Sequence, residues 1–256
     1  MAIKFDVEDD LTYRVDISVI AFGKEAINGV NNLLDNKINY FKYEFVNEAN
    51  DYNENAIVSL LKKTDLLIVL CTDNSYEDNV YHIAELAKHN KILSINIISS
   101  IKNYMDNYDT NLYLRKNKSY NDNIWMVFKC ICDLCIYRDF IGLDLWDIRP
   151  IIKNGKLAII NTGISSGERR YYNAMCNAME NMPKNKCKLL VNILCSRSEC
   201  SILGISESID CLLNNINTDV VDECYGCIDN NEYLNKDIQI IILATGLDVS
   251  DHHIYE

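Results

Sequence analysis

DLLIVLC, residues 65–71, is the stretch that decides the fold, because six consecutive apolar residues follow a single aspartate. Such a run is typical of a strand that is covered on both faces, as in the middle of a parallel sheet. Apolar residues with helical spacing follow at residues 81–87, and residues 92–98 again favour a buried strand. A strand, a helix and a further strand form the repeating unit of a parallel sheet, so we expect an α/β protein.

The same alternation continues on both sides of this stretch. Further strands are expected at residues 14–21, 42–46, 111–114, 155–161, 188–194, 220–228 and 238–244. Helices are expected around residues 26–34 and at 56–63, 120–137, 168–182 and 205–216. The pattern predicts a doubly wound sheet in the first half of the chain and a second α/β unit after a long helix.

Composition excludes several classes of protein. The chain has 256 residues, 48% of them hydrophobic, which is ordinary for a globular protein and too high for a disordered one. Its formal charge of −12 argues against a nucleic-acid or anionic-membrane binder, which needs a basic face. The first ten residues carry four acids and no apolar run, which is unlike a signal peptide. We therefore expect a cytoplasmic protein whose eleven cysteines are reduced, with no nucleic-acid partner and no direct membrane binding.

Residues 140–171, FIGLDLWDIRPIIKNGKLAIINTGISSGERRY, closely resemble the FtsZ family, the bacterial relatives of tubulin. In that family the corresponding stretch runs N-L-D-F-A-D-V-R, a KNGG-like turn, a strand ending in GTG, and A-S-G-E-x-R-A. The resemblance continues through LLVNILCS to the ATGL of residues 244–247. The order and spacing of these motifs make it specific.

The resemblance implies a fold and a division of the chain. It implies a reduced Rossmann-like domain of tubulin/FtsZ type at residues 1–119, which would be a degenerate nucleotide-binding domain. A long central helix at 120–139 and a smaller α+β domain with a mixed sheet at 140–256 would follow. Family members usually continue beyond the last strand into a peptide that contacts membrane adaptors, and a chain ending at residue 256 is expected to lack that route.

The two phosphate-binding loops of the family are rewritten in this sequence. Such loops need glycines, because the backbone must reach positive φ and the phosphate must approach without meeting a Cβ. The first loop, AFGKEAI at residues 21–27, keeps only Gly23, and the signature GGGTGTG becomes TDNSYED at 72–78. By alignment, the vestigial cofactor-binding residues are Gly23, Asn28 and Thr72. The family residue that reads guanine falls near Phe128.

Charge in these loops also opposes a triphosphate. Glu25, Asp73, Glu77 and Asp78 would repel it, and Lys24 offsets only part of this repulsion. The sequence therefore predicts that the protein has no cofactor and does not hydrolyse GTP. Three interpretations of the loops stay open: ordinary connections in which Asp73 or Ser75 caps a helix, a modified site that still binds GTP, and an acidic cation site.

Asp144 and Asp147 match two family carboxylates. In the family, these carboxylates enter the nucleotide site of the next subunit and orient the attacking water, so the resemblance implies a catalytic role in trans. Gly142 replaces the family's asparagine, which argues against that role. The alternative is that both aspartates are solvated or cap a helix around Ile151.

Three functions follow from these observations. The first is a non-hydrolysing relative, in a division-type cytoskeleton, that docks its Asp144 face onto a filament of an FtsZ-type protein. The second is self-association into a homo-oligomer or filament without nucleotide. The third is a polymerising GTPase with a rewritten phosphate loop. Cys224 and Cys227 have the spacing of half a metal or redox site, although buried free cysteines are commoner.

Overall fold

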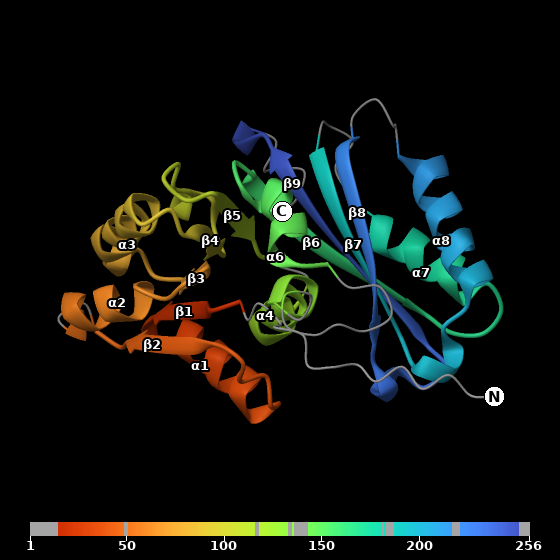
Figure 1. Ribbon diagram of the computed structural model, residues 1–256, viewed down its shortest axis with the longest axis horizontal. Helices are drawn as coiled ribbons and strands as arrows, with labels where there is room; N and C mark the ends of the chain where they lie inside the picture. The colour runs from red at the N-terminus through yellow and green to blue at the C-terminus, as the bar shows by residue number, and fades with distance from the viewer. Residues whose placement is uncertain are drawn as a thin grey trace, which may run out of the picture.

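Nine strands form one sheet in the part of the chain that the computed structural model describes, residues 15–48, 51–115, 118–132, 135, 143–180, 182, 187–216 and 221–250 (Figure 1). Their order is β2-β1-β3-β4-β5-β6-β9-β7-β8. The strands are β1 (Ile17–Phe22), β2 (Lys42–Val46), β3 (Leu66–Cys71), β4 (Leu93–Ile98), β5 (Thr110–Tyr113), β6 (Lys156–Ser165), β7 (Cys187–Cys195), β8 (Val221–Asn230) and β9 (Ile238–Leu247). The expected strands are thus confirmed.

The sheet is parallel from β2 to β6 and mixed beyond it. β3 lies between β1 and β4, and all six of its residues are buried, as its continuous apolar sequence predicts. β9 runs antiparallel between β6 and β7, and β8 completes the sheet parallel to β7. A doubly wound parallel half therefore continues into a mixed half.

Helices cover both faces of the sheet. They are α1 (Gly23–Asp35), α2 (Glu54–Leu61), α3 (Glu77–His89), α4 (Tyr120–Val127), α6 (Leu145–Ile152), α7 (Arg170–Met179) and α8 (Ile202–Asn215). One buried cluster joins α1, α4 and α6 to a single face of the sheet. On the other face, α2 and α3 cover the β1–β3 region, and α7 and α8 cover β6 to β9 (Figure 1).

Pairing between β5 and β6 joins the two halves of the chain. Thr110 to Tyr113 pair in parallel with Lys156 to Ile159, although α4 and α6 lie between them in the sequence. The Thr110 hydroxyl also donates a 2.5 Å hydrogen bond to the carbonyl of Ile152, at the end of α6. The described chain therefore has one continuous sheet, and domain boundaries at residues 119 and 139 stay a prediction.

The central helix changes character part of the way along. α4 begins after Ser119, whose hydroxyl accepts a 3.1 Å hydrogen bond from the Asp122 amide, and it ends at Val127. A π-helical turn, Phe128–Cys132, continues it, and four of the five side chains of this turn are buried. Residues 133–134 and 136–142, including Gly142, lie outside the described residues. Within the described chain, every helix is too short or too polar to cross a membrane.

Candidate functional site

The carboxyl ends of β1 and β3 lie side by side at one edge of the sheet. Phe22 and Cys71, the last residues of the two strands, are paired in register. Gly23 follows directly and begins α1, and Thr72 follows β3. The structure therefore brings these two predicted residues to neighbouring strand ends. In open parallel sheets, ligands bind at this edge, so we take it as the candidate site.

The ring of Tyr76 lies against Gly23. Gly23 has φ of +79°, and a Cβ built on it would meet Tyr76 Cε2 at 3.3 Å. Tyr76 is only 6% exposed, its hydroxyl donates a 2.5 Å hydrogen bond to the Asn47 carbonyl, and its ring centroid lies 5.5 Å from that of Phe22. An aromatic ring thus packs against the first turn of α1, where an anion would approach the helix amides.

The connection after β3 is closed by its own hydrogen bonds. Asp73 accepts a 2.9 Å hydrogen bond from the Ser75 amide and caps a 3₁₀ turn, Asn74–Tyr76, that leads into α3. The Cys71 thiol donates to the Asp73 carbonyl at 3.1 Å. This is the capping arrangement left open above, with Asp73 rather than Ser75 as the cap of that turn.

The acidic residues of this connection do not form a cation site. Asp73, Glu77 and Asp78 are exposed. Within the described residues, no group of three His, Cys, Asp or Glu side chains could hold a metal ion. In the Cys224-x-x-Cys227 pair, Cys224 is exposed, and the side chain of Cys227 lies outside the described part of the structure.

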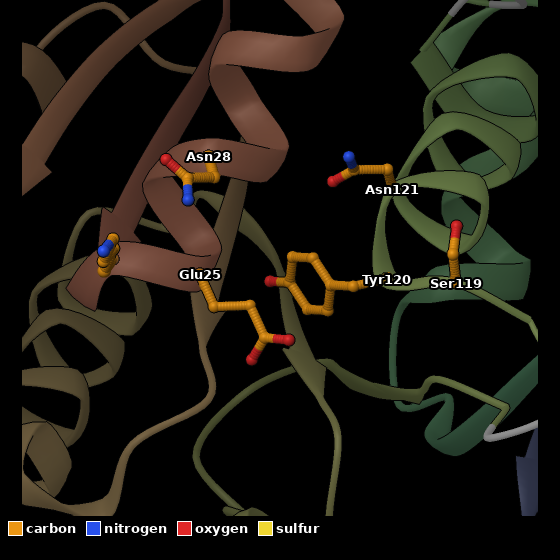
Figure 2. Close-up of a pocket in the computed structure, with 6 residues that line it drawn as sticks. Glu25, Asn28, Ser119, Tyr120 and Asn121 are labelled. Atoms are coloured by element: carbon orange, nitrogen blue, oxygen red, sulfur yellow. The ribbon is translucent and has the colours of Figure 1, made fainter.

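A cleft of about 420 Å³ opens between the first turns of α1 and α4 (Figure 2). Its lining residues are Lys24, Glu25, Asn28, Ser119, Tyr120 and Asn121. Asn28 is therefore the one predicted cofactor residue that lines it; Gly23 lies beneath Tyr76, and Thr72 is half-buried outside the lining. The cleft lies at the edge where the fold leaves room for a ligand.

Tyr120 reaches into this cleft from α4. Figure 2 shows its ring extending towards α1, with the hydroxyl facing the side of Glu25 and Asn28. The ring packs closely on α1, since a Cβ added to Gly29 would lie 2.8 Å from Tyr120 Cε1. Burial, and then the charge of Glu25, raise the pKa of Tyr120 far above its usual value. The Tyr120 hydroxyl is buried and without a hydrogen-bond partner in the described structure.

Phe128 does not take part in the cleft. Its side chain is fully buried, and its ring centroid lies 5.1 Å from that of Phe41 in the core. The position aligned with the family's guanine-reading residue therefore lies in the core, whereas the α4 residues that line the cleft lie at the start of that helix. Sequence reasoning missed Ser119, Tyr120 and Asn121, although a serine three residues before Asp122 is a helix-start signal.

Asp144 and Asp147 form a capping box at the start of α6. The Asp144 carboxylate accepts hydrogen bonds from the amides of Trp146 at 2.7 Å and Asp147 at 3.0 Å, and the Asp147 carboxylate accepts one from the Asp144 amide at 3.0 Å. Capping is therefore confirmed, as the alternative interpretation expected. Both side chains are exposed and neither lines the cleft, so a catalytic role in trans stays a prediction.

The fold is that of FtsZ and CetZ proteins. The FtsZ dimer from M. jannaschii superposes with a TM-score of 0.73 and 15% identity, over 92% of this chain and 89% of that one. CetZ from Methanosaeta thermophila superposes with a TM-score of 0.65 and 13% identity, over 93% of this chain and 89% of that one. CetZ1 from Haloferax volcanii, a GDP-bound monomer, superposes with a TM-score of 0.64 and 8% identity, over 94% of this chain and 98% of that one. No protein-family model matches the chain. The expected tubulin-like α/β fold is confirmed.

Proposed function

We propose that the protein is an FtsZ-like assembly or interaction protein that works without binding or hydrolysing GTP. The observation that carries the proposal is the ring of Tyr76, packed against Gly23 at the start of α1. A phosphate bound to the α1 amides would approach the helix end against which this ring packs.

Displacing the ring is unfavourable. Exposing a buried aromatic side chain costs roughly 1.5–3 kcal/mol, and breaking the hydrogen bond to Asn47 adds about 1 kcal/mol. Repulsion between a phosphate and Glu25 adds about 1–4 kcal/mol, depending on how exposed the pair is. Micromolar binding is worth only about 8 kcal/mol. Together these terms remove between about half and all of the free energy of micromolar binding.

The partner we propose is an FtsZ-type protein or a second copy of this chain, contacted through the start of α6. Trp146 is 65% exposed there, beside the capping aspartates, and the guanidinium of Arg149 lies 5.6 Å from the centre of its ring. Exposed tryptophan and arginine side chains are enriched at protein interfaces. The dimeric state of the M. jannaschii FtsZ supports self-association of this fold.

Two measurements test the proposal. Titration calorimetry with GTP and Mg²⁺ should give no binding at tens of micromolar protein, and a submicromolar dissociation constant would overturn the loss of GTP binding. Co-sedimentation should show the protein pelleting alone, independently of GTP, or together with filaments of an FtsZ-type protein. Trp146→Ala should abolish the pelleting, whereas Tyr233→Ala, at a 96% exposed aromatic residue, should preserve it. Absence of pelleting under both conditions would remove the assembly role.

A GTP-binding, polymerising GTPase is the second candidate. The cleft itself favours it, because Asn28 and Lys24 line a hollow at the ligand-binding edge of the fold, and the H. volcanii CetZ1 of the same fold binds GDP. The nucleotide content of the purified protein distinguishes the candidates, since a GTPase of this kind would retain guanine nucleotide. Chromatography of the acid-released supernatant measures it directly.

A further inference from the structure

Two thiols on neighbouring helices lie in contact, away from the cleft. Cys176 of α7 and Cys211 of α8 have their Sγ atoms 2.9 Å apart. The pair is separated by 35 residues in the sequence. Cys211 is fully buried, whereas Cys176 is half-buried. An oxidant therefore reaches Cys176 first.

The helices that carry the thiols are held together independently of them. Gly204 of α8 packs against the ring of Tyr171 of α7 so closely that a Cβ on the glycine would overlap it. The Tyr171 hydroxyl donates to the Glu199 carbonyl at 2.7 Å and accepts from the Ser201 amide at 3.2 Å. The packing of α7 on α8 therefore already holds the two sulfurs in contact, and a bond between them requires an approach from 2.9 Å to about 2.05 Å.

Three polar side chains lie near the two sulfurs, which otherwise pack in an apolar cluster. The Arg169 guanidinium lies 4.2 Å from the centre of the Tyr172 ring, and a hydrogen bond with Cys176 raises the pKa of Tyr172. The Asn215 amide donates to Cys211 Sγ at 3.6 Å. Burial, and then the contact with Cys176, raise the pKa of Cys211 to about 12, although Asn215 and Arg169 partly oppose this. Cys211 thus keeps its proton until its neighbour reacts, and groups that favour a thiolate are already in place.

We propose that Cys176 and Cys211 are a redox-active pair that forms a reversible disulfide between α7 and α8, with hydrogen peroxide as the oxidant. The Cys176 thiolate attacks the peroxide, an S–O bond forms, the O–O bond breaks, and hydroxide leaves as a sulfenic acid is made. Cys211 loses its proton and attacks the Cys176 sulfur, so that the S–S bond forms and a second hydroxide leaves. The two sulfurs together lose two electrons, and the peroxide and the two thiol protons become two waters. A dithiol reductant reverses the reaction by exchange.

Peptide mapping tests the pair directly. The full chain is treated with stoichiometric hydrogen peroxide, alkylated, and cleaved with trypsin and a glutamate-specific protease. Residues 171–180 and 208–223 are then released as fragments with one cysteine each. The expected product is these two fragments joined, lighter by two hydrogens and separated again by dithiothreitol. Oxidation of Cys176 to sulfinic acid, or linkage of either cysteine elsewhere without this product, would overturn the proposal.

Matched serine variants provide the control. Cys176→Ser, at a half-buried position, should lose both the joined fragments and the rise of several degrees in melting temperature that oxidation gives the wild type, since a disulfide restrains the unfolded chain. Cys224→Ser removes an exposed thiol of β8 and should retain both. Far-UV circular dichroism checks that each variant folds. The peptide map of the oxidised wild type tests the proposal even if one of the variants fails to fold. Equal oxidation-linked stabilisation in the Cys176→Ser variant would contradict the proposal.

Discussion

Tyr76 and Tyr120 both pack against glycines of α1 beside the candidate site. Tyr76 packs on the glycine that begins α1, and Tyr120 packs on Gly29 one turn and a half further along the same helix. Each ring approaches the α1 backbone closely because the glycine beneath it has no Cβ. Gly23 and Gly29 thus serve internal packing in this chain.

We predict that Tyr76→Phe lowers the free energy of unfolding by about 1 kcal/mol, because it removes the hydrogen bond to the Asn47 carbonyl and leaves the ring in place. Urea denaturation followed by circular dichroism measures the change. Tyr81→Phe is the control: this tyrosine of α3 is 55% exposed, so its hydroxyl can hydrogen-bond to water in either state. An equal loss in both variants would show that the hydrogen bond from Tyr76 to Asn47 makes no specific contribution to the free energy of unfolding.

The sequence predicted the local features of this region but not its contacts between distant residues. Loss of the loop glycines and capping by Asp73 follow from local rules about φ and helix ends, which need only neighbouring residues. The position of the Tyr76 ring depends on the pairing of β1 with β3, which brings residues far apart in sequence together. The burial of Phe128 against Phe41 likewise depends on a contact between residues far apart in the sequence.

At the scale of elements, strands were predicted better than helix ends. The continuous apolar run of β3 identifies a buried strand without knowledge of its neighbours. α6 was expected only as a helix around Ile151, and Pro150 lies inside it. It nevertheless forms, and the capping box at Asp144 and Asp147 satisfies amides of its first turn.

We predict that Asp144→Ala lowers the free energy of unfolding by about 1 kcal/mol, because it leaves two amides of the first turn of α6 without their acceptor. Thermal and urea denaturation measure the loss. Asp144→Asn keeps a capping oxygen and should cost clearly less, with only the charge removed from the helix start. Loss of assembly in both variants at unchanged stability would instead assign the carboxylate to an interface.

The contact between β6 and α7 gives the strongest prediction at this scale. A Cβ on Gly163 would overlap the backbone of Ala174 and Ala178, which cannot move aside as a flexible side chain can. Gly163→Ala should therefore lower the free energy of unfolding by about 2–3 kcal/mol. Gly226→Ala, on the edge strand β8, has open space around it and should change stability by less than about 0.5 kcal/mol. Similar values for both would mean that α7 packs less tightly on β6.

At the scale of the whole molecule, one continuous sheet joins the two halves into which the sequence pattern divides the chain. The cluster that includes Val19 and Ile68 in the first half also includes Ile160 and Leu243 in the second. The sequence suggested a boundary because a second run of strands and helices follows the long helix. Periodicity within single elements carries no information about which strand edges meet, so the pairing of β5 with β6 was not predictable from it.

We predict that the two halves unfold as one cooperative unit, because separating them would break the β5–β6 pairing and divide one apolar core. Hydrogen exchange read by mass spectrometry measures this, since peptides from β3 and β9 should exchange with the same opening free energy and the same dependence on urea. Thr110→Val, which removes the hydrogen bond to Ile152, should lower both values together. If β9 peptides opened at much lower urea than β3 peptides, the halves would be independent domains joined by a pairing that contributes little.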